Sequence, residues 1–393
     1  MTARHAVVSG ASIAGLSAAF WLRRTGWEVT VLERAEEFRD GGQNVDVRGT
    51  AREVLTRMGL FEAVKEQNTI ETATVFVDSS GRVRAEMPAG TDGATAELEV
   101  LRGDFASTIL RNLPAGVEIH YGDTVSAVDE EAGEHVTVTT AAGRTLKADL
   151  LVIAEGVRST TRDTLFGDDV ERRDLGVSMV FGTIPRTAGD DTRWRWYTTT
   201  GGRQVHLRPD NHGTTRAMLA CTGNIAVRDR GEALRRFRER FADAGWEARR
   251  VLDELDRSRD VYVDQLTQIR MTTWHRGRVC LAGDAAWCVT PMGGGGASLA
   301  LISGYVLAAA LSANGVEDGL AAYGKWMRPL VDDVQNFPRW VLRFAFPQTA
   351  RGLRLRHLAD RVVTSRLLAP LTAKVTQVAD SEQALPPITV PQA

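Results

Sequence analysis

The pattern of apolar and polar positions at the start of the chain predicts a strand, a helix and a second strand in quick succession. An apolar run covers residues 6–9, a helical pattern covers residues 13–24, and a second apolar run ends at Glu33. The segment GASIAG, residues 10–15, joins the first strand to the helix. This order is typical of a βαβ unit that begins a parallel sheet.

Farther along, strand and helix patterns alternate in longer blocks. Residues 73–99 predict a hairpin of antiparallel strands, and four β-rich runs between about 175 and 225 predict one antiparallel sheet. Residues 231–256 read as a charged pair of helices, and residues 331–378 are mostly helical in pattern. Sheet-forming insertions therefore interrupt a chain whose remainder has α/β character.

The stretch 285–316 carries no charged side chain. A membrane-spanning helix needs about 20 apolar residues. Here the apolar part is shorter, opens with glycines and contains Ser298, Ser303 and Tyr305. We therefore expect a helix buried in a large core and no stable membrane insertion.

These patterns predict an α/β fold in which a Rossmann-like nucleotide domain is interleaved with an antiparallel-sheet domain and followed by a C-terminal helix. The predicted units are the nucleotide domain at 1–72, 100–174 and 260–330, the sheet domain at 73–99 and 175–259, a helical segment at 331–380, and a flexible tail at 381–393.

Composition narrows the partners and the location. The chain has 393 residues with 48 basic and 50 acidic side chains, so its net charge of −2 favours neither nucleic acid nor an anionic membrane. Its three cysteines show neither CxxC nor metal-ligand spacing, so we expect no metal site and no disulfide framework. This cysteine usage and the lack of a signal-peptide pattern predict a cytoplasmic protein.

The GASIAG segment is nearly the G-x-G-x-x-G turn that binds a dinucleotide. Gly10 supplies the tight turn, Gly15 allows close helix packing, and small Ser12 still permits a pyrophosphate to approach. Glu33 ends the second strand at the position of the acid that accepts from a ribose hydroxyl. An ordinary packing turn explains the glycines but leaves Glu33 unexplained.

A second glycine-rich segment lies at 278–298, with the sequence RVCLAGDAAWCVTPMGGGGAS. A predicted strand ends at Gly283-Asp284, and a loop with Pro291 and four glycines leads into the charge-free helix. The acid can accept from ribose or ribitol hydroxyls, and the helix start offers bare N–H groups to a flat ligand. A flavin requires such a second binding segment, because its ring is bound far from its adenine end, whereas a nicotinamide cofactor does not.

With these segments the sequence resembles the single-component, FAD-dependent aromatic hydroxylases related to para-hydroxybenzoate hydroxylase, whose FAD domain is of the GR2 type. In length and motif spacing it is most similar to their tetracycline-inactivating monooxygenase branch. The resemblance covers residue 1 to about 375 and rests on GASIAG with Glu33-Arg34, on DLLVIAEGVRSTTR (149–162), and on Gly283-Asp284. Three positions depart from the family pattern: Ser12 replaces glycine, Glu155 replaces aspartate, and Trp287 stands where many members have histidine.

The resemblance implies cofactors and site residues. It implies FAD, with NADPH or NADH as reductant and O2 as co-substrate; oxygen would add at flavin C4a, and the hydroperoxide would oxidise an aromatic or polycyclic, polyketide-like molecule. Glu155, Gly156 and Arg162 fall in the NAD(P)H region, Gly41-Gly42 would let the flavin ring swing out, and a monomer or homodimer is expected. The expected FAD contacts are Gly10, Ser12, Ile13, Ala14, Gly15, Glu33, Arg34, Asp46, Arg102, Asp284, Pro291, Gly294, Gly295, Gly296 and Ala297.

The substrate pocket is expected between the flavin ring and the sheet of residues 175–225. We assign no certain catalytic residue; the candidates are Gln204, His206 and Pro291. Gln204 and His206 share a strand face by period two, which also fits a solvated sheet face. Similarly, Trp194, Trp196 and Tyr197 fit either stacking on a substrate or core packing.

Three functional classes stay open from sequence: a monooxygenase, an FAD-dependent reductase or dehydrogenase that inserts no oxygen, and a non-catalytic flavoprotein that carries a ligand. Flavin halogenases share the fold, but their Trp-x-Trp-x-Ile-Pro signature is absent from the sequence.

Overall fold

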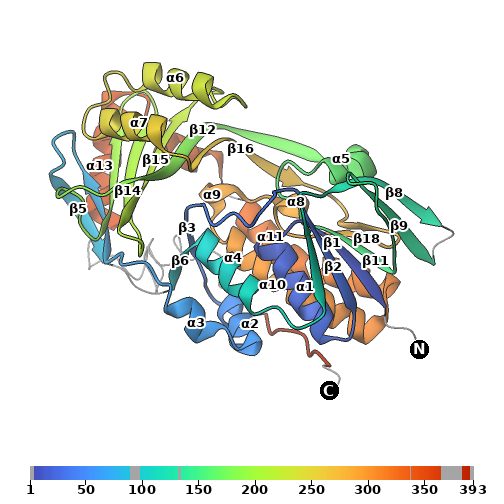
Figure 1. Cartoon of the computed structure of the whole chain (residues 1–393). Coiled ribbons are helices and arrows are strands. Elements are labelled where there is room, and N and C mark those ends of the chain that lie inside the picture. Colours follow the sequence, from blue (N-terminus) through green and yellow to red (C-terminus); the bar gives the residue numbers. More distant parts are fainter. Residues whose placement is uncertain (1–3, 89–97, 132–133, 337, 364–382, 390–393) are drawn as a thin grey trace.

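The computed structural model describes residues 4–88, 98–131, 134–336, 338–363 and 383–389. Figure 1 shows two sheet-based regions, with the long strands β12 (Glu171–Pro185) and β16 (Val261–Arg270) extending from one toward the other. The α/β fold predicted from the sequence is confirmed.

The first region is built on a six-stranded sheet with the order β17-β18-β11-β1-β2-β7 (Figure 1). All neighbours pair in parallel except the edge pair β17–β18. Its inner strands are buried almost without interruption, as expected of a parallel sheet that is covered on both faces. The bounds are β1 (His5–Ser9), β2 (Glu28–Glu33), β7 (Val117–Tyr121), β11 (Leu150–Ile153), β17 (His275–Arg276) and β18 (Val279–Leu281).

Helices α1 (Ile13–Arg24), α10 (Gly296–Asn314) and α11 (Glu317–Gln335) pack together beside this sheet (Figure 1). Gly304 of α10 allows the close approach to α1, since a Cβ there would lie 2.4 Å from the backbone nitrogen of Ala18. Helix α10 is long and apolar enough to cross a membrane by composition, but 78% of its most apolar window is buried inside the protein. The predicted buried core helix is therefore confirmed.

The second region is a seven-stranded sheet with the order β16-β12-β15-β14-β13-β4-β5. Helices α6 (Arg230–Arg240) and α7 (Ala248–Arg257) cover one face, where Val205, Leu207 and Leu219 form a core with Phe237 and Leu252. Its further strands are β4 (Ala73–Val77), β5 (Val83–Pro88), β13 (Arg193–Thr199), β14 (Arg203–Pro209) and β15 (Thr214–Thr222).

This sheet is mixed, which corrects the expectation of a purely antiparallel one. Strand β4 pairs with β5 in the predicted antiparallel hairpin, but it pairs in parallel with β13, with Val75 opposite Arg195. A tight hairpin forces antiparallel pairing only on strands that are adjacent in sequence. Because β4 and β13 are far apart in the chain, nothing local fixes their relative direction. Strand β16, within the range that we assigned to the nucleotide domain, pairs with β12 of this sheet.

Smaller elements complete the fold. A three-stranded sheet of β8 (Val125–Glu131), β9 (His135–Thr140) and β10 (Thr145–Ala148) packs on the core of the first region. The loop expected at 40–48 contains a short strand, β3 (Asn44–Asp46), which pairs with β6 (Glu99–Leu101). The remaining helices are α2 (Thr50–Met58), α3 (Phe61–Lys65), α4 (Arg102–Arg111), α5 (Thr160–Phe166), α8 (Asp284–Trp287), α9 (Thr290–Gly293), α12 (Arg339–Ala345), α13 (Ala350–Val363) and the 3-10 turn η1 (Gly167–Asp169).

The tail departs from the prediction of a flexible segment. Within residues 383–389, Leu385 is buried in the core of the first region, and the carbonyl oxygen of Pro386 accepts a hydrogen bond of 2.8 Å from the hydroxyl of Tyr305. This part of the tail is held by the burial of Leu385 and by the Tyr305 hydroxyl, which needs an acceptor. The proline-rich composition of the tail did not predict these contacts.

Candidate functional site

The turn between β1 and α1 requires its two glycines. Gly10 has φ of +108°, and a Cβ there would lie 2.4 Å from the carbonyl oxygen of Ala154. A Cβ on Gly15 would lie 1.8 Å from the carbonyl oxygen of Gly10. The turn therefore packs backbone against backbone, which is what the glycine positions predicted.

Ser12 and Arg102 meet at the start of α1. Ser12 precedes the helix in extended conformation and gives the first turn no side-chain cap, which leaves the α1 amides to bind an anion. Arg102 begins α4 and donates from Nη1 to the Ser12 hydroxyl at 3.3 Å and from Nη2 to the carbonyl oxygen of Gly41 at 3.2 Å. Helix amides and a guanidinium together suit a pyrophosphate.

Glu33 borders the same turn. Its two carboxylate oxygens accept hydrogen bonds of 2.9 Å from the backbone nitrogens of Ala11 and Ala35. Each oxygen keeps a second lone pair, so the partly exposed carboxylate still has room for a ribose hydroxyl. Arg34 beside it is exposed.

Asp284 reaches the turn from the other end of the sequence. Gly283 has φ of +60°, and a Cβ there would lie 2.7 Å from the Cβ of Ala14. The side chain of Asp284 keeps a solvent-exposed surface although protein surrounds it. The surrounding protein raises the pKa of this carboxyl, and the positive charge of Arg102 partly offsets the rise. Arg102 bonds to Ser12 and its charge acts on Asp284, so the three residues lie near one another, and we call the site that they form the cofactor cleft.

The glycine run gives α10 an unusual start. Gly294 and Gly295 have φ of +65° and +67°, and Gly295 precedes the helix without a side-chain cap. Ser298 in the first turn donates to the carbonyl oxygen of Asp46 at 3.0 Å, so β3 lies against this helix start. Gly296 and Ala297 are partly buried, and Pro291 is exposed. These positions agree with the expected flavin contacts, which stay predictions.

The middle motif is tied into the protein. The carboxylate of Glu155 accepts hydrogen bonds of 2.6–2.7 Å from the hydroxyls of Ser9, Ser159 and Thr161. Gly156 has open space where a Cβ would be. Arg162 is fully buried and donates to Asp163 and to the carbonyl oxygen of Ala285. Arg162 therefore holds the middle motif against the Gly283-Asp284 segment and offers no accessible surface to a reductant.

The sequence analysis missed Tyr262 and Asp264 on β16. Tyr262 is 41% exposed, its ring lies 5.0 Å from that of Phe181, and the Arg158 guanidinium lies 5.7 Å from its ring centroid. Burial, with the nearby charges of Asp264 and Asp284, raises the pKa of the Tyr262 phenol to about 12. The alternation of Tyr262 and Asp264 in VYVD, which places both side chains on one face of β16, was the sequence signal for these two residues.

Gln204 and His206 are buried, at 3% and 2% exposure, so the solvated-face alternative is wrong. They lie on the sheet face opposite α6 and α7. The Trp194 indole N–H donates to His206 Nδ1 at 3.1 Å, His206 Nε2 lies 3.1 Å from Gln204 Oε1, and Gln204 Nε2 donates to the carbonyl oxygen of Ala345 at 2.7 Å. This chain implies a neutral imidazole with its proton on Nε2. Burial lowers the pKa of His206 well below its ordinary value, and Arg208 and Arg356 add to the effect.

The tryptophans beside this chain are packed by protein. The guanidinium of Arg208 lies 4.0 Å from the ring centroid of Trp194, and Trp194 stacks on Trp196 at 5.2 Å. Phe76 packs on Trp196 at 5.6 Å. Since these neighbours occupy the ring surfaces, the packing interpretation is favoured over stacking on a substrate. Tyr197 points to the other core, where its hydroxyl donates to the carbonyl oxygen of Ala244.

Trp287 is also a packing residue. It is 1% exposed and lies 4.5 Å from Trp274 and 6.2 Å from Tyr323 between ring centroids. The ring that stands in place of the family's histidine therefore faces the protein core. Cys221, Cys280 and Cys288 are all buried and unpaired.

The residues of the cofactor cleft fit FAD. The pyrophosphate would be held by the uncapped amides of α1 and by the guanidinium of Arg102, at the turn where Gly10 and Gly15 leave no room for a Cβ. Glu33 would hold the adenosine ribose. Asp284 would accept from the ribitol, and the glycine start of α10 would face the ring. Among the residues described, no group of three or more His, Cys, Asp or Glu side chains could hold a metal ion.

Comparisons with known proteins agree with this cleft. The family model for the FAD binding domain matches residues 4–337. A flavin-dependent monooxygenase of Legionella longbeachae is 32% identical in an alignment 344 residues long that covers 85% of this chain and 88% of that protein. The crystal structures of tetracycline destructases Tet(55) and Tet(51) superpose with TM-scores of 0.80 and 0.78 at 26% and 27% identity. The matches cover 100% and 93% of this chain and 99% and 98% of theirs.

The predicted resemblance to FAD-dependent hydroxylases, including their tetracycline-inactivating branch, is thereby confirmed. The cleft, the matched family and the similarity along nearly the whole chain agree on one assignment. The chain belongs to the FAD-dependent monooxygenase family and is an FAD-binding enzyme of that family.

Proposed function

We propose that this enzyme uses NADPH or NADH and O2 to insert one oxygen atom into an aromatic or polycyclic small molecule. The observation that carries the proposal is an aromatic wall next to the cofactor cleft. This wall consists of Tyr262, whose ring is exposed, and Phe181 beside it. The charge of Asp284 in the cleft acts on the Tyr262 phenol, so the wall and the cleft are neighbours. An exposed aromatic wall beside a flavin site suits a flat, ring-containing substrate.

The named similarity to tetracycline destructases supports a polycyclic substrate, since those enzymes act on tetracycline by name. FAD held by Glu33, Arg102 and Asp284 would supply the redox chemistry that couples oxidation of the nicotinamide to the use of O2. The chain's own part is to bind and orient. The start of α10 carries no acidic residue in its first turn, so its amides and dipole favour negative charge beside it.

Gln204, His206 and Pro291 remain the candidates for positioning the substrate. The hydrogen-bond chain from Trp194 through His206 to Gln204 supports an indirect role, in which His206 fixes the side chains of this sheet face and does not exchange protons with the substrate. Glu155 and Gly156 remain candidates for the region that meets the reductant.

The test is oxidation of NADPH and of NADH, measured with a panel of phenolic and polycyclic compounds under oxygen-18 gas. Stimulated oxidation and a product that gains one labelled atom support the proposal. Label from water, or anaerobic turnover without oxygen insertion, supports the reductase alternative. Tight FAD binding with no turnover of any compound supports the ligand carrier.

A further inference from the structure

The loop between α8 and α10 contains a strained residue. Thr290 has φ of +63°, a left-handed conformation that costs a β-branched residue roughly 1–3 kcal/mol. Its hydroxyl is buried and has no hydrogen-bond partner among the described residues. A residue held in this way needs strong contacts nearby, and this loop also carries Pro291 and the glycines expected at the flavin ring.

Those contacts converge on the side chain of Gln335 at the end of α11. Its Nε2 donates to the carbonyl oxygen of Ile269 at 2.8 Å and to that of Cys288 at 3.4 Å. The backbone nitrogen of Ile269 also donates to the Cys288 carbonyl oxygen, at 3.2 Å. One buried amide thus joins α11, β16 and the loop two residues before Thr290.

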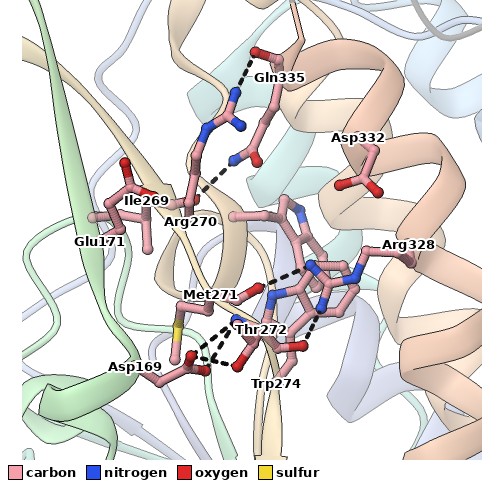
Figure 2. Close-up of a pocket in the computed structure, with 11 residues that line it drawn as sticks. Asp169, Glu171, Ile269, Arg270, Met271, Thr272, Trp274, Arg328, Asp332 and Gln335 are labelled. Carbon is pink, nitrogen blue, oxygen red and sulfur yellow. Dashed lines mark hydrogen bonds between the residues drawn. The ribbon is translucent and has the colours of Figure 1, made fainter.

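The main chain of Gln335 is held by the same strand. Its carbonyl oxygen has no partner within the helix and accepts a hydrogen bond of 2.8 Å from Arg270 (Figure 2). It also accepts one of 3.2 Å from Gln268. Arg328, two turns earlier in α11, donates to the carbonyl oxygens of Met271 and Thr272. Helix α11 and the end of β16 therefore cannot shift independently.

The residues that make these contacts line a pocket of about 250 Å³, together with Asp169, Glu171 and Asp332 (Figure 2). On the pocket side, Gln335 and Arg270 have space instead of packed side chains. Dispersion contacts are missing there, so hydrogen bonds must carry the positioning. Strand β16, which these bonds hold, carries Tyr262 of the aromatic wall at its other end.

We propose that Gln335 is a positioning residue for the oxygenation reaction: it sets the Cys288–Gly295 loop relative to the aromatic wall without touching cofactor or substrate. The effect on the reaction rests on the proposed monooxygenase function, whereas the effect on bound FAD does not. A shifted loop would displace the α10 amides from the flavin, and misplacements of about 1 Å can cost roughly a hundredfold in rate.

The test compares Gln335→Met with Gln268→Met, each purified with FAD. Both variants remove a buried amide that bonds across α11 and β16, but only Gln335 contacts the Cys288 carbonyl. The readouts are the visible absorption spectrum and reduction potential of bound FAD without substrate, and hydrogen peroxide released per nicotinamide oxidised with substrate. Thermal denaturation reports stability.

We expect Gln335→Met to change the spectrum and potential and to raise peroxide release several-fold, up to roughly tenfold, while Gln268→Met changes only stability. If both variants lose stability and keep the wild-type flavin spectrum and potential, Gln335 is merely structural and the inference is wrong. If the spectrum and potential change but no variant or wild type oxygenates any compound, the inference stands for the cofactor loop and the monooxygenase proposal fails.

Discussion

Arg102 at the start of α4 donates a hydrogen bond of 3.3 Å to the hydroxyl of Ser12, ninety residues earlier in the chain. This contact places a guanidinium at the start of α1, where serine replaces the middle glycine of the dinucleotide turn. The departure from the glycine pattern therefore leaves the site open to a phosphate and adds a hydroxyl to it.

Arg102→Ala should weaken FAD binding by roughly tenfold to a hundredfold, because a hydrogen bond to a charged group contributes about 1.5–3 kcal/mol. Arg102→Lys keeps the charge but loses the forked geometry, so its affinity should lie between the two. Titration of apoprotein with FAD measures the loss. Arg111→Ala, at the exposed other end of α4, is the control and should bind FAD as wild type does.

Gly15→Ala should prevent folding or destabilise the protein by several kcal/mol, since the new methyl group would lie 1.8 Å from a backbone oxygen that cannot move away cheaply. Gly324→Ala is the matched control within a helix, because among the described residues no atom beyond its own helical turn lies within 4 Å of its Cβ position. It should stabilise by about 0.5–1 kcal/mol. Urea denaturation compares the two, and a Gly15→Ala protein of wild-type stability would contradict the close packing of the turn.

The first βαβ unit could be predicted because its determinants are local. Apolar periodicity, the glycine turn and Thr25-Gly26 at the helix end lie within thirty residues, and α1 begins and ends at the expected residues. Gly10 and Asp284 were predicted as cofactor contacts from motif chemistry and Arg102 from the family resemblance, and their roles in holding a dinucleotide stay predictions.

The remainder depended on contacts between distant segments. Period two placed Gln204 and His206 on one face of β14, but it could not show that both faces are buried, as they are from Arg203 to Leu207. The parallel pair β4–β13 and the position of Gln335 likewise join segments far apart in sequence, for which one chain offers no local signal. Tyr262 was not predicted, since its strand joins the sheet by pairing with β12, which lies far away in the sequence.

His206 should make stability depend on pH. Burial lowers its pKa in the folded protein, so below the unfolded value near 6.5 only the unfolded chain takes up the proton, and stability falls as pH falls. Relative to His206→Gln, wild type should lose about 1.4 kcal/mol between pH 7.5 and 5.5. Urea denaturation at both pH values measures the difference. A constant difference would show that His206 takes up its proton equally in the folded and the unfolded protein.

Asp284 and Glu155 should differ in what their removal costs. Asp284 is exposed in the cofactor cleft and has no hydrogen-bond partner among the described residues, whereas Glu155 accepts from three hydroxyls. Asp284→Ala should therefore lower FAD affinity by roughly tenfold to a hundredfold and leave stability unchanged or raised, since the surroundings already raise the pKa of this carboxyl and disfavour its charge.

Glu155→Ala should show the opposite pattern. It leaves the hydroxyls of Ser9, Ser159 and Thr161 without their acceptor, which should cost about 1–3 kcal/mol of stability for each group that stays buried and unpaired. FAD retention should change less than in Asp284→Ala. The FAD-to-protein ratio after gel filtration and the denaturation midpoint, measured on both variants, separate the two roles. Equal FAD loss in both variants would contradict the placement of Asp284 on the cofactor, because a shared loss would then reflect general loosening of the domain.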